Sequence, residues 1–192
     1  MTARLANICR HPIKSHGRED LASVRLLAGE GLPWDRHWAV AHDAARLVAG
    51  WNNWVNFARG AKAPSLMAIE ARLDEATASV TLTHPEREPL HFRPDDTSDL
   101  PLFLAWVKGL NPEGRAQPAQ IVKAGRIMSD TAFPSVSILN LASNRDLSAR
   151  MGVDLSPYRW RGNLWVEGLA PWSEWDLIGA RLRIGEAELE VR

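Results

Sequence analysis

The residues best suited to chemistry in this sequence are cations, hydroxyls and amides that stand where strands are predicted to begin or end. Arginine offers a bidentate hydrogen-bonding fork and lysine a mobile point charge, so such a set can hold a phosphate or a polar pterin. Loops at strand ends are also where binding sites are usually built. Taken singly, each is most often a solvated surface residue, so only the set indicates an anion-binding site. The set lies in four segments: Lys14 and Ser15, Asp35-Arg36-His37-Trp38, Ser129-Asp130-Thr131, and Arg159-Trp160-Arg161-Gly162-Asn163.

Signatures of the common catalytic classes are missing from the sequence. It has no G-x-S-x-G, H-E-x-x-H, C-x-x-C, G-x-x-x-x-G-K-[ST] or G-x-G-x-x-G motif. The six histidines do not have the spacing of zinc ligands, and we interpret them as packing or surface residues. Cys9 lies in an apolar predicted strand, so we interpret it as a small buried hydrophobe rather than a nucleophile.

Composition narrows the classes of partner. The 192 residues are 45% hydrophobic and 24% charged, which is typical of a globular protein. The 23 basic and 23 acidic residues cancel, so no global field attracts nucleic acid or a membrane surface. No apolar run approaches the roughly 18 residues that span a bilayer. A single cysteine excludes an intramolecular disulfide framework, and we expect a reducing, cytoplasmic location.

Tryptophan is unusually frequent, with nine residues in the chain. Aromatic side chains carry large buried areas, so we expect most of them to pack in the core or at its rim. The alternative is a shelf for a flat heterocycle, and composition does not favour it.

The hydrophobic pattern predicts many short strands and two helices. A helix is expected over residues 99–110, and a shorter one with Ser143 and Asp146 as a capping box and Gly152 at its end. The last segment alternates around Gly185 and predicts an antiparallel hairpin. Without a βαβ rhythm, the pattern predicts an α+β, predominantly β, barrel-like architecture. The other strands are expected at residues 5–15, 23–27, 37–42, 68–73, 79–82, 119–122, 136–139 and 164–166, with loops at 84–89 and 94–98.

Several of these segments, in the same order, resemble the MOSC family. Pro-Ile-Lys-Ser at residues 12–15 and Asp-Arg-His-Trp at 35–38 are similar to the N-terminal β-barrel portion that accompanies MOSC domains. Ser-Asp-Thr at 129–131, followed by residues 137–143 and by Arg-Gly-Asn-Leu at 161–164, resembles the MOSC domain itself. Related proteins are the molybdenum-cofactor sulfurases and the mitochondrial amidoxime-reducing component. We therefore expect residues 1–95 to form the first part and 96–192 a MOSC domain truncated at its C-terminus.

The resemblance implies a bound molybdenum cofactor (molybdopterin). In the family a cysteine after the last hairpin ligates molybdenum or carries a persulfide, and we expect it beyond Arg192. No catalytic or metal-ligating residue is therefore assigned within the chain, and Cys9 stands in the wrong place to substitute. By position, Lys14, Ser15 and Arg36 would hold the phosphate end, while Ser129, Asp130, Thr131, Arg161 and Asn163 would line the pterin or metal side.

The chain departs from the family pattern after the strand that follows Arg36. The family often has a Thr-x-Arg segment there, and this chain has Leu-Val-Ala-Gly at residues 47–50. Arg59 is a candidate replacement, although a plain surface role for it is the simpler expectation.

Three functions follow from the resemblance. The first is a small oxidoreductase that reduces N-oxygenated substrates, with molybdenum supplying the redox chemistry. Its electrons would come from a separate redox protein, because the chain has no flavin or iron–sulfur signature. The second is a persulfide carrier that receives sulfur from a donor protein. The third is a non-catalytic β-barrel module that binds a small anion or a partner. None of the three involves nucleic acid or a membrane.

Overall fold

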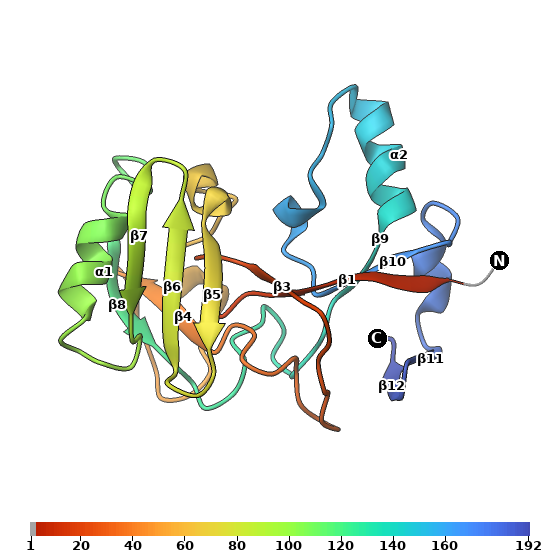
Figure 1. The fold of residues 1–192 in the computed structure, drawn as a ribbon, viewed down its shortest axis with the longest axis horizontal. Helices are drawn as coiled ribbons and strands as arrows, with labels where there is room; N and C mark the ends of the chain where they lie inside the picture. The colour runs from red at the N-terminus through yellow and green to blue at the C-terminus, as the bar shows by residue number, and fades with distance from the viewer. Residues whose placement is uncertain (1–2) are drawn as a thin grey trace. The chain divides into compact units, whose positions relative to one another are not determined.

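The structure, a computed structural model, describes residues 3–192 and divides them into two compact units (Figure 1). The α1 unit contains Arg10–Glu19 and Gly29–Ser135. The α2 unit contains the residues up to Cys9, Asp20–Ala28 and Val136–Arg192. Each unit is thus assembled from separate stretches of the chain. The boundary expected between residues 95 and 96 stays a prediction.

Two three-stranded sheets and one helix form the α1 unit. In the first sheet, β2 (Ile13–Lys14) is parallel to β4 (Trp38–His42), and β4 is antiparallel to β8 (Pro118–Val122). The second sheet is an antiparallel meander of β5 (Glu70–Asp74), β6 (Ser79–His84) and β7 (Arg87–Phe92). One face of such a sheet packs on the core and the other faces solvent. The remaining elements of this unit are α1 (Leu100–Val107) and the 3-10 helices η1 (Trp54–Asn56) and η2 (Pro64–Ala68).

Both sheets and α1 bury side chains in one core. Trp38 of β4, Leu82 of β6 and Phe103 of α1 are all fully buried in it. Phe103 stacks on Phe92 of β7, with ring centroids 5.2 Å apart. Each such side chain stabilises the fold by about 1.5–3 kcal/mol, so this core fixes the strand ends that carry the predicted site.

The α2 unit has a four-stranded sheet in the order β3 (Glu19–Leu21), β1 (Arg4–Arg10), β10 (Leu164–Glu167), β9 (Ile138–Asn140). β1 is antiparallel to β10, whereas β9 and β10 are parallel. Between these two parallel strands run α2 (Leu141–Met151) and the 3-10 helix η3 (Pro157–Trp160). The sequence pattern did not indicate this single βαβ crossover. The unit ends with η4 (Ser173–Leu177) and the antiparallel hairpin of β11 (Arg181–Ile184) and β12 (Ala187–Glu190).

The ends of α2 differ in part from the prediction. Gly152 ends the helix in the left-handed conformation, at φ 66°, as expected. Its N-cap, however, is Asn140, whose side chain accepts a hydrogen bond from the amide of Ala142 at 2.9 Å. Ser143 lies inside the first turn and donates to Glu174 at 2.7 Å. Asparagine caps as well as serine does, and here it precedes the helix.

The fold class is confirmed as α+β and predominantly β, with two α-helices among residues 3–192. Within that range the strands form open sheets, and no closed barrel is present. The segment at residues 5–15 breaks at Pro12, which lacks the amide that a strand ladder needs. The strand expected at residues 23–27 is wrong, because that segment is irregular. The expected loop at 84–89 is wrong as well, since it turns directly into β7. No helix among the described residues is long and apolar enough to cross a membrane.

Candidate anion-binding site

The centre of the candidate site is the loop of residues 128–132, which follows β8 in the α1 unit. Three side chains from different parts of that unit donate hydrogen bonds to its backbone carbonyls. Lys14 Nζ donates to Met128 O at 2.8 Å, and Trp51 Nε1 donates to Ser129 O at 3.2 Å. Arg126 Nη2 donates to Ala132 O at 3.1 Å. The loop that carries the predicted Ser-Asp-Thr motif is therefore held in shape from three sides.

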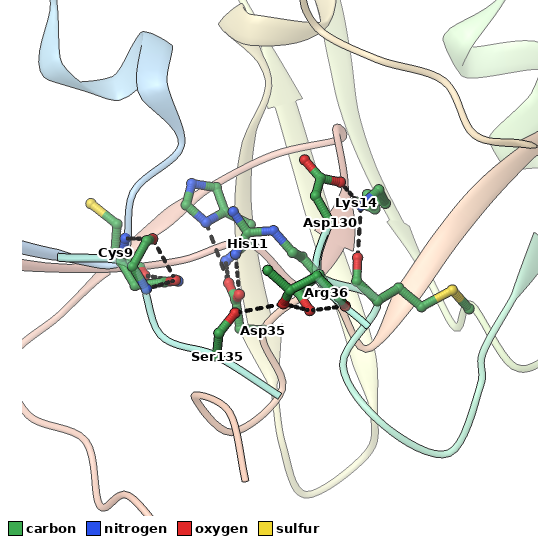
Figure 2. Close-up of polar contacts among 12 residues, drawn as sticks. Cys9, His11, Lys14, Asp35, Arg36, Asp130 and Ser135 are labelled. Carbon is green, nitrogen blue, oxygen red and sulfur yellow. Dashed lines mark hydrogen bonds and ion pairs between the residues drawn. The ribbon is translucent and has the colours of Figure 1, made fainter. Parts of the chain in front are cut away.

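Lys14 is both buried and paired with the loop. Its ammonium lies 2.5 Å from Asp130 Oδ1, and the two side chains differ sharply in exposure, at 8% and 76% (Figure 2). The pair thus joins a buried ammonium to a solvent-exposed carboxylate.

Arg36 reaches the same loop through its backbone. Its carbonyl accepts a hydrogen bond from the amide of Met128 at 2.9 Å, and its own amide donates to the carbonyl of His11 at 2.6 Å. The side chain forms an ion pair with Asp35. Met128 thus bonds to the backbone of Arg36 through its N–H and to the ammonium of Lys14 through its C=O, so both residues contact the loop at Met128.

Asp35 anchors the cationic side of the site (Figure 2). It is fully buried and accepts from the backbone amide of His11 at 2.8 Å, with His11 Nδ1 at 3.3 Å. Burial alone would raise the pKa of this carboxyl, but the Arg36 guanidinium and the His11 contacts outweigh it and hold the pKa well below its ordinary value. Asp35 is consequently ionised at neutral pH and fixes the direction of Arg36.

Three residues at or near the predicted cations have strained backbone conformations. Ser15, Trp34 and Arg36 all have left-handed backbones, with φ of 65°, 63° and 48°. This conformation costs a residue with a side chain roughly 1–2 kcal/mol. Such strain persists where the surrounding structure enforces it, and it is concentrated at binding and catalytic sites.

The hydroxyls of the loop bond to one another rather than to the cations. Ser129 Oγ lies 3.1 Å from Thr131 Oγ1, which donates to Phe133 O at 2.7 Å. Thr131 Oγ1 also lies 3.0 Å from Ser135 Oγ (Figure 2). Hydroxyls rotate readily between donor and acceptor roles, so this chain can re-form around the polar edge of a ligand.

The structure brings together most of the predicted set but not all of it. Lys14, Ser15, Arg36 and the Ser-Asp-Thr motif belong to the α1 unit. Arg161 and Asn163 belong to the α2 unit, in which Arg161 follows η3 with a left-handed backbone. Asn163 is buried, and its amide donates to Cys9 O at 3.1 Å and accepts from Ser137 Oγ at 2.9 Å. Their predicted role toward a ligand stays a prediction.

Two residues outside the site behave as packing residues. Cys9 is 1% exposed, and its thiol donates to Asp20 Oδ1 at 3.2 Å, in agreement with the interpretation as a buried hydrophobe. Arg59 stacks on Trp54, with Cζ 4.2 Å from the ring centroid. Trp54 is one of four tryptophans among the exposed large hydrophobic residues, whereas Trp38 and Trp165 are buried in the core.

Sequence reasoning missed Trp51, Arg126, His11 and Asp35. Trp51 and Arg126 act through contacts between loops that are far apart in the chain, and no local pattern marks them. Asp35 stands within the quoted Asp-Arg-His-Trp motif, so its position beside Arg36 was the one available signal. Among residues 3–192, no group of three or more His, Cys, Asp or Glu side chains is arranged to hold a metal ion.

The fold and the loop define a small, predominantly β protein with a cationic, hydroxyl-bearing site at the ends of its strands. A family model described as the MOSC N-terminal beta barrel domain matches residues 2–133. The match covers well over half of the chain, which therefore belongs to the MOSC family, as the sequence resemblance predicted. No curated protein matches the chain, and neither does any solved structure.

Proposed function

We propose that this chain binds the molybdenum cofactor, with the phosphate end held by Lys14, Arg36 and the 128–132 loop. The observation that carries the proposal is the pair of hydrogen bonds through which Met128 contacts the Lys14 ammonium and the Arg36 backbone. We assign the chain to a small oxidoreductase that reduces N-oxygenated substrates with electrons from a separate redox protein. When bound, the cofactor would supply the oxygen-atom or two-electron chemistry.

The donor set suits an organic phosphate. A phosphate takes charge-assisted hydrogen bonds from ammonium and guanidinium groups, which are roughly twice as strong as neutral ones. Lys14 meets this need once the exposed carboxylate of Asp130 turns away. Arg36 keeps its buried partner Asp35, and its guanidinium adds a second positive charge to the site. The site thereby exchanges one solvated carboxylate for the phosphate of the ligand.

The pterin side would be held by polar side chains. Ser129 and Thr131 present hydroxyls from the loop, whereas the roles of Arg161 and Asn163, which belong to the α2 unit, stay a prediction of the sequence resemblance. The part of these residues is to bind and orient the cofactor. Cys9 does not offer a thiolate to molybdenum, because it is buried and donates to Asp20.

The decisive experiment is cofactor loading in cells that make the molybdenum cofactor. The purified protein is analysed for molybdenum by mass spectrometry and for pterin by the fluorescence of its oxidised form. We expect both in the wild-type protein and at least a tenfold loss in Lys14→Met, since one charge-assisted hydrogen bond contributes about 1.5–3 kcal/mol. Lys62→Met removes an exposed lysine of the same unit and serves as the control.

The outcomes separate the candidate functions. Pterin and molybdenum in the wild type and the control, with loss in Lys14→Met, support the proposal. Equal loading in all three proteins would mean that the cofactor is held elsewhere. A wild-type product free of both would favour the non-catalytic binding module. A persulfide carrier would instead show cyanide-releasable sulfur after incubation with a cysteine desulfurase.

A further inference from the structure

Arg126 is a half-buried cation that no carboxylate neutralises. Among residues 3–192 it takes part in no ion pair, whereas Lys14 and Arg36 are each paired with an aspartate. Its guanidinium lies over the ring of Trp51, with Cζ 5.4 Å from the ring centroid. A positive charge without an acidic partner can attract an external anion without first displacing a carboxylate.

One nitrogen of this guanidinium lacks a hydrogen-bond partner. Nη2 donates to Ala132 O at 3.1 Å, but Nη1 is buried and has no acceptor among the described residues. Leaving a buried donor of a charged group unsatisfied is costly, and native structures almost always satisfy such groups with protein, water or ligand. Nη1 is therefore an unsatisfied donor beside the 128–132 loop, and an oxygen atom of a ligand would satisfy it.

Arg126 is positioned beside the loop by its contacts to Trp51 and Ala132. Trp51 stabilises the guanidinium through a cation–π contact and is itself fixed by the bond from Nε1 to Ser129 O. Because Nη1 is buried, the guanidinium must turn on the ring of Trp51 for this nitrogen to meet an anion at the loop. Asp130 and Ala132 are exposed, so an anion can approach the loop from solvent.

We propose that Arg126, stacked on Trp51, is a further anion-binding residue of this site and donates from Nη1 to an oxygen of a phosphate group. The inference rests on the proposed function, since it concerns the phosphate end of the same ligand. Unlike Lys14 and Arg36, Arg126 forms no ion pair with an aspartate among residues 3–192. The ligand class is a phosphate monoester, and inorganic phosphate is its simplest probe.

The test measures the binding of inorganic phosphate to the full chain by calorimetry and by the phosphate-dependent rise in melting temperature. We expect Arg126→Met to weaken phosphate binding at least tenfold, and Arg126→Lys to restore part of it because the charge returns. Trp51→Phe keeps an aromatic face but loses the hydrogen bond from Nε1 to Ser129 O, so it should lose part of the affinity. Arg115→Met, in an exposed turn of the same unit, should bind phosphate as the wild type does.

A measurement on the wild-type protein guards against variants that fold poorly. Phenylglyoxal modifies arginine, and peptide mapping reports each site. Phosphate should protect Arg126 and leave Arg115 reactive. Equal phosphate affinity in wild type and Arg126→Met, or no protection of Arg126, overturns the inference.

The experiments can refute the role of Arg126 and the proposed function independently of each other. If molybdopterin loads normally in Arg126→Met while Lys14→Met loses it, the function stands and the role of Arg126 is wrong. If phosphate binds through Arg126 but the wild type carries no pterin, the anion site stands and the cofactor assignment is wrong.

Discussion

The ammonium of Lys14 lies 2.5 Å from the carboxylate of Asp130, a contact that joins a buried cation to an exposed anion. In the proposed function, this carboxylate stands where the phosphate of the ligand would bind. Asp130 is thus a competitor for Lys14, and its removal should favour binding of a free anion.

We therefore expect Asp130→Asn to raise the affinity for inorganic phosphate several-fold. Asp130→Asn also leaves the buried Lys14 ammonium without its carboxylate, so the free energy of unfolding should fall. Calorimetric titration with phosphate and urea unfolding measure the two quantities. A weaker affinity in Asp130→Asn would show that Asp130 helps the ligand to bind instead of competing with it.

Replacement of Asp35 should strongly lower the free energy of unfolding, because Asp35 is fully buried. Asp35→Asn leaves the Arg36 guanidinium without its buried partner, which typically costs about 3–5 kcal/mol. Urea unfolding at neutral pH measures this loss. Asp154→Asn, at an exposed carboxylate, serves as the control and should stay within about 0.5 kcal/mol of the wild type.

The pH dependence of stability tests the same carboxyl independently. The pKa of Asp35 is lower in the folded chain than its ordinary value of 3.8, so the unfolded chain binds more protons in acid. The contribution of Asp35 is therefore present above about pH 4 and is lost as the pH falls below it. Unfolding curves at pH 3 and pH 6 should differ less for Asp35→Asn than for the wild type. Parallel pH dependence in the two proteins would contradict the ionised state assigned to Asp35.

The parts of the site that follow from local sequence were predicted, and the parts that depend on tertiary contacts were not. Lys14, Ser15 and Arg36 stand beside short apolar strands, so their place at strand ends could be expected. The pairing of Trp51 with Arg126 joins two loops, and no periodicity relates them. The left-handed backbones of Ser15 and Arg36 also escape notice, because neither residue is the glycine that signals this conformation.

The same distinction explains the fold. The strands β4, β6 and β8 alternate or cluster apolar residues and were found. β7 begins with Arg87 and contains Pro89, which favour a loop by composition, yet it lies at the edge of its sheet, where proline is tolerated. Residues 23–27 alternate as a strand would, but they do not join a sheet, and Val24 and Leu26 line an apolar groove of the α2 unit instead.

Backbone strain at Ser15 gives the last prediction. Ser15 has φ 65°, a conformation that costs a side-chain-bearing residue roughly 1 kcal/mol and costs glycine almost nothing. Ser15→Gly should therefore leave the protein as stable as the wild type or more stable by up to about 1 kcal/mol, although it weakens phosphate binding by removing a hydroxyl. Ser156→Gly is the matched control, because Ser156 has φ −55° and its side chain makes no capping bond, so glycine there should only destabilise. Thermal unfolding and phosphate titration of both variants test the two effects. A loss of stability in Ser15→Gly equal to that in Ser156→Gly would mean that the left-handed backbone is not strained and that the Ser15 side chain itself stabilises the fold.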